Sequence, residues 1–74
     1  MQKSIITVKN AVFSAWESSG RIVHAIILIE TVRGITARPM LHDGTILRKL
    51  RELRAEGKLD YIVKSKQYSI YEKK

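Results

Sequence analysis

The sequence predicts one small α+β domain with three helices, a short strand and a C-terminal pair of strands. A chain of 74 residues has room for a single hydrophobic core and no deep catalytic pocket. Two patterns indicate the fold class. Apolar residues recur at helical spacing in residues 43–57, and they alternate at strand spacing after residue 58.

Residues 43–57 carry the clearest helical signal in the chain. An apolar stripe, which we expect to centre between Leu47 and Leu50, would face the core; it consists of Ile46, Leu47, Leu50 and Leu53. Asp43 is expected to be the N-cap, because its carboxylate can accept hydrogen bonds from free N–H groups of the first turn. Gly57 can adopt the left-handed conformation that ends the helix.

The opposite side of this helix is expected to be polar, basic and free. It would carry Thr45, Arg48, Lys49, Glu52 and Ala55. Arg51 lies on the flank, and Arg54 falls close enough to the stripe to lay its stem along the core edge. A simpler interpretation is a solvated surface with an Arg48–Glu52 pair, which would stabilise the helix by only a few tenths of a kcal/mol.

The first half of the chain predicts a helix from Thr7 to Ser18 with Trp16 in the core. Ser18, Ser19 and Gly20 are expected to stop this helix, and Gly20 can serve as its C-terminal cap. Periodicity does not separate strand from helix in the apolar run that follows. We interpret residues 22–24 as a short strand and 25–33 as a second helix ended by Gly34. If this helix is not fully covered, Ile26 or Ile27 would be exposed and could form a homodimer contact.

Residues 36–42 contain Pro39 and form a connector, because proline cannot continue a helix. Two strands follow the third helix, and their alternation predicts that Val63 faces Tyr68 and that Tyr61 faces Ile70. A two-residue turn at Ser65-Lys66 would lack the Gly or Asn that such turns favour. We therefore expect a looser four-residue tip at 64–67.

The net charge of +7 is concentrated in the second half of the chain. Residues 1–32 have a net charge of +1, and residues 33–74 have +6. Such a basic excess is typical of proteins that bind phosphates. An anionic membrane surface is the competing partner, but the basic residues alternate with core positions and do not form one long amphipathic helix.

Other classes of function find little support in the residues. There is no cysteine, so we expect no disulfide and no thiolate metal site. His24 and His42 have no ligand partner at helical spacing, and no Ser or carboxylate stands in a catalytic motif. We therefore expect no enzyme activity, no cofactor and no small-molecule ligand. No signal peptide is evident and the apolar run 25–29 cannot span a bilayer, which predicts a cytoplasmic protein, at the nucleoid or, if viral, in the host cytoplasm.

The predicted element order resembles the winged helix-turn-helix family over almost the whole chain. The most specific part is Asp43–Tyr71, where Thr-Ile-Leu-Arg-Lys-Leu-Arg-Glu-Leu-Arg-Ala-Glu-Gly-Lys-Leu is similar to a recognition helix that leads into a wing strand. Two features depart from that family. The connector with Pro39 is longer than the tight turn of many members, and the wing is short.

The resemblance implies that the third helix enters the major groove of double-stranded DNA and that the wing tip contacts the backbone or the minor groove. The implied DNA-binding residues are Arg38, His42, Thr45, Arg48, Lys49, Glu52, Lys64, Ser65 and Lys66. Arg48 would contact guanine, and Glu52 would accept from cytosine or orient Arg48. Such a protein would be a small transcription regulator or an accessory factor in DNA transactions.

The main alternative is a winged-helix docking module that binds another protein without contacting DNA. The basic helix face favours DNA, whereas an exposed apolar patch around Ile26 and Ile27 would favour docking. No appended segment for an effector is evident, so a ligand-responsive repressor is not expected.

Overall fold

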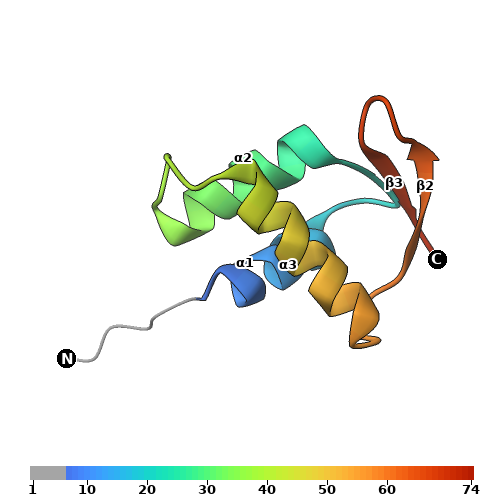
Figure 1. Cartoon of the computed structure of the whole chain (residues 1–74), viewed down its shortest axis with the longest axis horizontal. Helices are drawn as coiled ribbons and strands as arrows, with labels where there is room; N and C mark the ends of the chain where they lie inside the picture. Colours follow the sequence, from blue (N-terminus) through green and yellow to red (C-terminus); the bar gives the residue numbers. More distant parts are fainter. Residues whose placement is uncertain (1–6) are drawn as a thin grey trace.

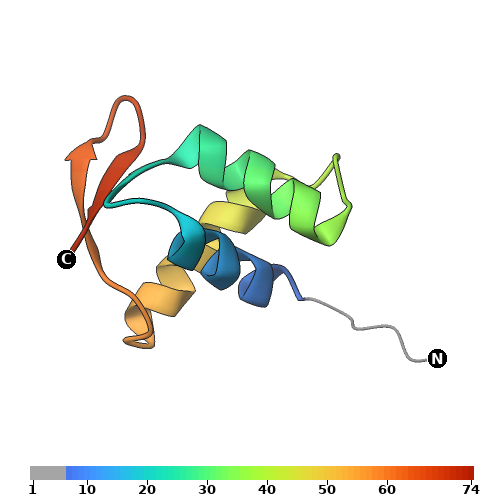
Figure 2. The same cartoon turned by 180° about the vertical axis from the view of Figure 1, so that it is seen from behind.

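The computed structural model describes residues 7–74 and has the α+β architecture expected from the sequence. Three helices pack together, and a small antiparallel sheet lies at the end of the molecule where α1 ends, α2 begins and α3 ends (Figures 1 and 2). The elements are α1 (Val8–Ser18), β1 (Ile22–His24), α2 (Ala25–Thr36), α3 (Asp43–Ala55), β2 (Tyr61–Ser65) and β3 (Ile70–Lys73).

The helices begin and end close to the predicted residues, but their caps differ. Thr7 caps α1 by accepting a hydrogen bond from the Asn10 N–H at 3.1 Å. α1 ends at Ser18 as predicted, but its cap is Ser19 and not Gly20, and the Ser19 N–H donates to the Trp16 carbonyl. Gly57 does follow α3 in the left-handed conformation, with φ of 78°, as predicted.

The predicted end of α2 at Gly34 is wrong. The helix continues to Thr36, and Ala37 takes the left-handed conformation with φ of 55°. The N–H groups of Ala37 and Arg38 then donate to the carbonyls of Gly34 and Arg33 and close the last turn. The residue with positive φ is therefore Ala37, which follows the last residue of the helix, and not Gly34, which lies inside the helix.

β3 is the central strand of the sheet, with β1 and β2 on either side. The predicted hairpin register is wrong: Val63 pairs with Tyr71, and Tyr61 pairs with Lys73. The connection is a four-residue turn at Lys66–Ser69, in which the Ser65 Oγ accepts a hydrogen bond from the Tyr68 N–H and Ser69 has positive φ. Tyr68 consequently lies in the turn and is 68% exposed.

The core joins the three helices to the inner face of the sheet. Its helical part contains Val12, Leu28, Val32, Ile46 and Leu50, all at most 1% exposed. Trp16 is buried as predicted, and its ring lies 5.4 Å from the Tyr61 ring and 6.4 Å from the Tyr71 ring. This aromatic cluster packs the hairpin against α1.

Candidate functional site

The buried stripe of α3 consists of Ile46, Leu50 and Leu53, which are at most 2% exposed. Leu47 is only half-buried and lies on the side of the hairpin. The centre of the stripe is therefore rotated by roughly 60° from the expected position between Leu47 and Leu50. Because of this rotation, the side chains on the two flanks of α3 differ from those that the sequence pattern indicated.

One flank of α3 faces α1, and its charges are paired. Lys9 of α1 donates a hydrogen bond to Glu56, and its Nζ lies 3.9 Å from a Glu52 carboxylate oxygen. Lys49 Nζ lies 3.5 Å from the same oxygen. The hydrogen bond from Lys9 lowers the pKa of Glu56 below its ordinary value, although partial burial opposes the shift. The expectation of a free face is wrong here, because Lys49 and Glu52 are half-buried and paired.

The other flank faces the hairpin and carries Arg51 and Arg54. The Arg54 guanidinium lies 4.5 Å from the centre of the Tyr61 ring, and its Nε donates to Asp60 Oδ1 at 3.2 Å. Arg54 is thus held against the core edge, as predicted from the sequence. Arg51 is exposed and makes no ion pair with any acidic residue among residues 7–74.

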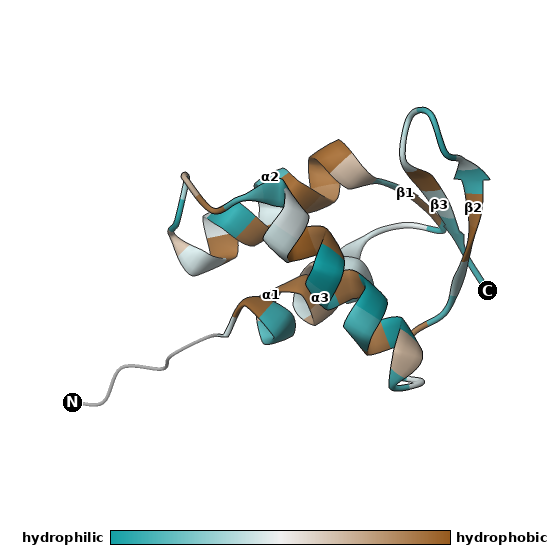
Figure 3. Ribbon diagram, in the orientation of Figure 1, coloured by the Kyte–Doolittle hydropathy of each residue, from teal (hydrophilic) through white to brown (hydrophobic). Residues whose placement is uncertain are grey.

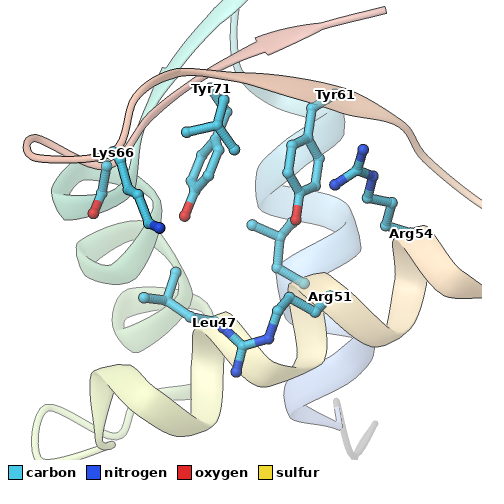
Figure 4. Close-up of a pocket in the computed structure, with 9 residues that line it drawn as sticks. Leu47, Arg51, Arg54, Tyr61, Lys66 and Tyr71 are labelled. Atoms are coloured by element: carbon cyan, nitrogen blue, oxygen red, sulfur yellow. The ribbon is translucent and has the colours of Figure 1, made fainter.

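A groove of about 410 Å³ separates this flank from the hairpin. Arg51 and Leu47 line it from α3, and Lys66 and Tyr71 extend toward them from the hairpin (Figure 4). The complete lining is Leu47, Leu50, Arg51, Arg54, Tyr61, Val63, Lys66, Ser69 and Tyr71. The groove therefore combines apolar walls with three cations.

The Tyr71 hydroxyl also points into the groove (Figure 4). Burial raises the pKa of Tyr71, the nearby Tyr61 raises it further, and the positive charge of Arg51 opposes both effects. Arg51 therefore acts electrostatically on the hydroxyl across the groove. Sequence reasoning missed Arg51 because the stripe of α3 is rotated from its expected position, and it missed Tyr71 because the incorrect register put Tyr68 in its place.

The two lysines near the hairpin turn lie in different environments. Lys64 Nζ is 3.3 Å from Glu72 Oε1, and Arg21 Nη2 is 2.7 Å from the other oxygen of that carboxylate. The hydrogen bond from Lys64 is the main cause that lowers the pKa of Glu72. Lys66, in contrast, lines the groove and has no acidic partner among the described residues. Ser65 is half-buried and supports the turn.

The predicted residues ahead of α3 do not all project as free side chains. His42, and not Asp43, is the N-cap, and its Nδ1 accepts a hydrogen bond from the Gly44 N–H at 3.0 Å. Asp43 is instead the first helical residue, with its Oδ1 3.3 Å from His42 Nδ1. Arg38 is exposed in the connector, and Thr45 is half-buried on α3.

The cations of the described residues differ in whether a carboxylate pairs with them. Most basic residues of the described chain lie within 4.0 Å of a carboxylate, and Lys73 instead donates to the Ser19 carbonyl. Besides Lys73, the cations without an acidic partner between residues 7 and 74 are Arg38, Arg48, Arg51 and Lys66. Two of these four, Arg51 and Lys66, line the groove, and Arg48 lies one helical turn before Arg51.

The first turn of α2 contains a second exposed feature. The start of this helix is hydrophobic (Figure 3), and Ile26 and Ile27 there are 73% and 62% exposed. Both residues are therefore exposed, as a homodimer contact through them requires. The homodimer itself stays a prediction.

Within residues 7–74, no three His, Cys, Asp or Glu side chains lie together in a way that could hold a metal ion. Over the same range, no helix has the length and hydropathy needed to cross a membrane. Comparison with protein-family models, with curated proteins and with solved structures found no match.

Proposed function

We propose that this chain is a winged-helix domain that binds double-stranded DNA, with α3 in the major groove and the β2–β3 hairpin as the wing on the phosphate backbone. The proposal rests on one observation above all. The unpaired cations Arg51 and Lys66 line one groove and Arg48 lies one helical turn before Arg51, whereas carboxylates neutralise most of the remaining basic residues. A surface of unpaired positive charge attracts a polyanion.

The α3 side chains suit different parts of a duplex. Arg48 is exposed on the side opposite the buried stripe, and its planar guanidinium can donate to O6 and N7 of one guanine. Arg51 stands closer to the hairpin and is better placed for the backbone. Lys49 and Glu52 take part in pairs with α1, so they receive a smaller part in this proposal than the sequence suggested.

The hairpin supplies phosphate contacts through Lys66 rather than through Lys64. Lys64 would have to leave Glu72 before it could bind a phosphate, whereas Lys66 has no such partner among residues 7–74. Arg38 adds an exposed positive charge in the connector before α3. A domain of this kind would serve as a small regulator of transcription or as an accessory factor in DNA transactions.

Fluorescence anisotropy with a labelled random duplex tests the proposal. We expect binding at about 50 mM salt that weakens strongly by about 200 mM, because phosphate contacts release counterions. No affinity at the lower salt concentration would overturn the proposal.

Arg48→Ala tests the role of the helix face, using a duplex selected from a random library as the specific site. The variant should lose about 1–3 kcal/mol of binding free energy on the selected site and much less on random duplex. Lys49→Ala is the matched control on the same helix, and it should change both affinities little because Lys49 is already paired with Glu52. Equal losses for Arg48→Ala on every sequence would contradict base recognition by Arg48.

The exposed Ile26 and Ile27 support a second candidate, a protein-docking module without DNA contact. The two candidates predict opposite results for one pair of variants. Ile26→Ser with Ile27→Ser should leave duplex affinity unchanged if α3 and the hairpin bind DNA. A docking module would show no duplex affinity in either form.

A further inference from the structure

The groove between α3 and the hairpin has walls that a duplex backbone does not require. Leu47 is half-buried, Val63 is 50% exposed and Tyr71 is half-buried, and all three line the groove. The outside of a duplex presents phosphates and sugars, while its bases are stacked inside. A ligand that used the whole groove would therefore combine negative charge with an apolar surface.

The size of the groove is also that of a small-ligand site. Its volume of about 410 Å³ falls within the range of roughly 300–1,000 Å³ typical of sites for small molecules and cofactors. The cations stand on both sides of the apolar walls, with Arg51 on α3 and Lys66 on the hairpin (Figure 4). An unstacked nucleotide has this combination, because its base is apolar on both faces and its phosphates are charged.

We infer that the groove binds one unstacked nucleotide of single-stranded DNA, with the base against Leu47, Val63 and Tyr71 and the flanking phosphates against Arg51 and Lys66. The inference rests on the proposed DNA binding and extends it from duplexes to strands with unpaired bases. Non-specific single-strand sites combine a basic groove with apolar and aromatic contacts to bases in this way.

Charge favours a nucleic acid over an acidic peptide as the occupant. Neither Arg51 nor Lys66 has an acidic partner among residues 7–74. Arg48 continues the positive charge along α3 beyond the groove, at the i,i+3 spacing from Arg51. A strand with one phosphate per nucleotide can follow such a line, while a peptide would need carboxylates at matching positions.

The test compares a labelled oligothymidine of about 10 nucleotides with an abasic strand of the same length. Both strands carry the same phosphates, so the difference in affinity for the wild-type chain reports on base contacts alone. We expect the oligothymidine to bind at least about fivefold more tightly, as befits one buried base. Equal affinities would overturn the inference, and this comparison needs no variant that has to fold.

Two neighbouring substitutions then locate the base. Val63 lines the groove, whereas Ile62 on the same strand projects to the opposite face of the sheet and is similarly exposed, at 42%. Val63→Ser should lower the preference for oligothymidine over the abasic strand, and Ile62→Ser should leave it unchanged. Equal effects of the two substitutions would place the base elsewhere and contradict the inference.

Parallel titrations with a duplex and with an acidic, leucine-containing peptide separate the remaining outcomes. If the wild-type chain does not bind the duplex but still prefers oligothymidine over the abasic strand, the proposed duplex function is wrong and the single-strand site is supported. Duplex binding with equal affinity for the two strands would overturn the single-strand site alone. Peptide binding that is weakened by Val63→Ser, without a preference for oligothymidine, would identify the groove as a peptide site.

Discussion

The two flanks of α3 differ in charge pairing although they belong to one helix of alternating basic and apolar residues. On the α1 side, Lys49 and Glu52 form a paired cluster with Lys9. On the hairpin side, Arg51 faces a groove whose other wall carries Lys66, and neither has an acidic partner among residues 7–74. A helical wheel does not distinguish these flanks, because the difference depends on which neighbouring element supplies carboxylates or cations.

Charge pairing elsewhere in the molecule also determines where positive charge is available. The carboxylates of Asp60 and Glu72 each hold two basic side chains, Arg54 with Lys74 and Arg21 with Lys64. These pairs are exposed or partly exposed, so they contribute little stability. Arg51 and Lys66, which line the groove, are in contrast among the cations that have no acidic partner between residues 7 and 74.

The largest expected effect comes from removing the core residue beneath both flanks. Leu50 is 1% exposed at the centre of the stripe, so Leu50→Ala should lower the free energy of unfolding by about 2–5 kcal/mol through lost burial and a residual cavity. Urea denaturation measures the change. Ile26→Ala, at a position that is 73% exposed, should change the stability by less than about 0.5 kcal/mol. Similar losses for the two variants would show that the core assignment is wrong.

A smaller effect should distinguish the paired flank by its dependence on pH. Lys9 lowers the pKa of Glu56 in the folded chain, so this carboxylate stabilises the fold above the pKa of the unfolded chain. That stabilisation should be lost as the pH falls below about 4.3 and through the folded pKa. Melting temperatures measured from pH 7 downward test this, and Glu56→Gln should flatten the profile.

Glu17→Gln is the control for this pH profile, because Glu17 on α1 is exposed and makes no ion pair with the described residues. Its melting profile should follow that of the wild type. Identical flattening by the two substitutions would show that the Lys9–Glu56 pair does not act on stability.

The sequence was sufficient to predict the fold class and the order of the elements, because each signal is local. Three such signals involve only residues that are close in the chain: the helical spacing in α3, the β-branched residues of β1 and the glycine at position 57 after α3. The predicted burial of Trp16 and Leu50 follows from the same periodicity. These features need no knowledge of the neighbouring elements.

The hairpin register could not be predicted from the sequence, because more than one pairing of the two strands places apolar side chains on the same face of the sheet. The expected pairing used Tyr68 and Ile70, while the observed one uses Tyr71, whose ring lies 4.9 Å from that of Tyr61 and near Trp16. Packing against a tryptophan from α1 therefore decides between the registers. Ser69 has positive φ, a conformation that is energetically unfavourable for residues other than glycine. Turn preferences in the sequence would therefore not place the turn there.

The candidate site was predicted only in part for the same reason. Arg48 and Lys66 were named from the sequence, but Arg51 and Tyr71 were missed, because the site depends on the rotation of α3 and on the hairpin register. Lys64 and Lys66 looked equivalent at the turn, and only the position of Glu72 opposite β2 separates them. Pairing across a sheet is not visible from local spacing.

The salt dependence of duplex binding by Lys66→Ala and Lys64→Ala tests the central claim most directly. The two lysines lie two residues apart in one hairpin, and they differ in that Lys64 is paired with Glu72 while Lys66 faces the groove. We expect Lys66→Ala to flatten the slope of log K against log salt by about one unit, since one phosphate contact is lost, and Lys64→Ala to leave the slope unchanged. Equal slopes for the two variants, or a flatter slope for Lys64→Ala alone, would contradict the claim that unpaired charge around the groove binds DNA.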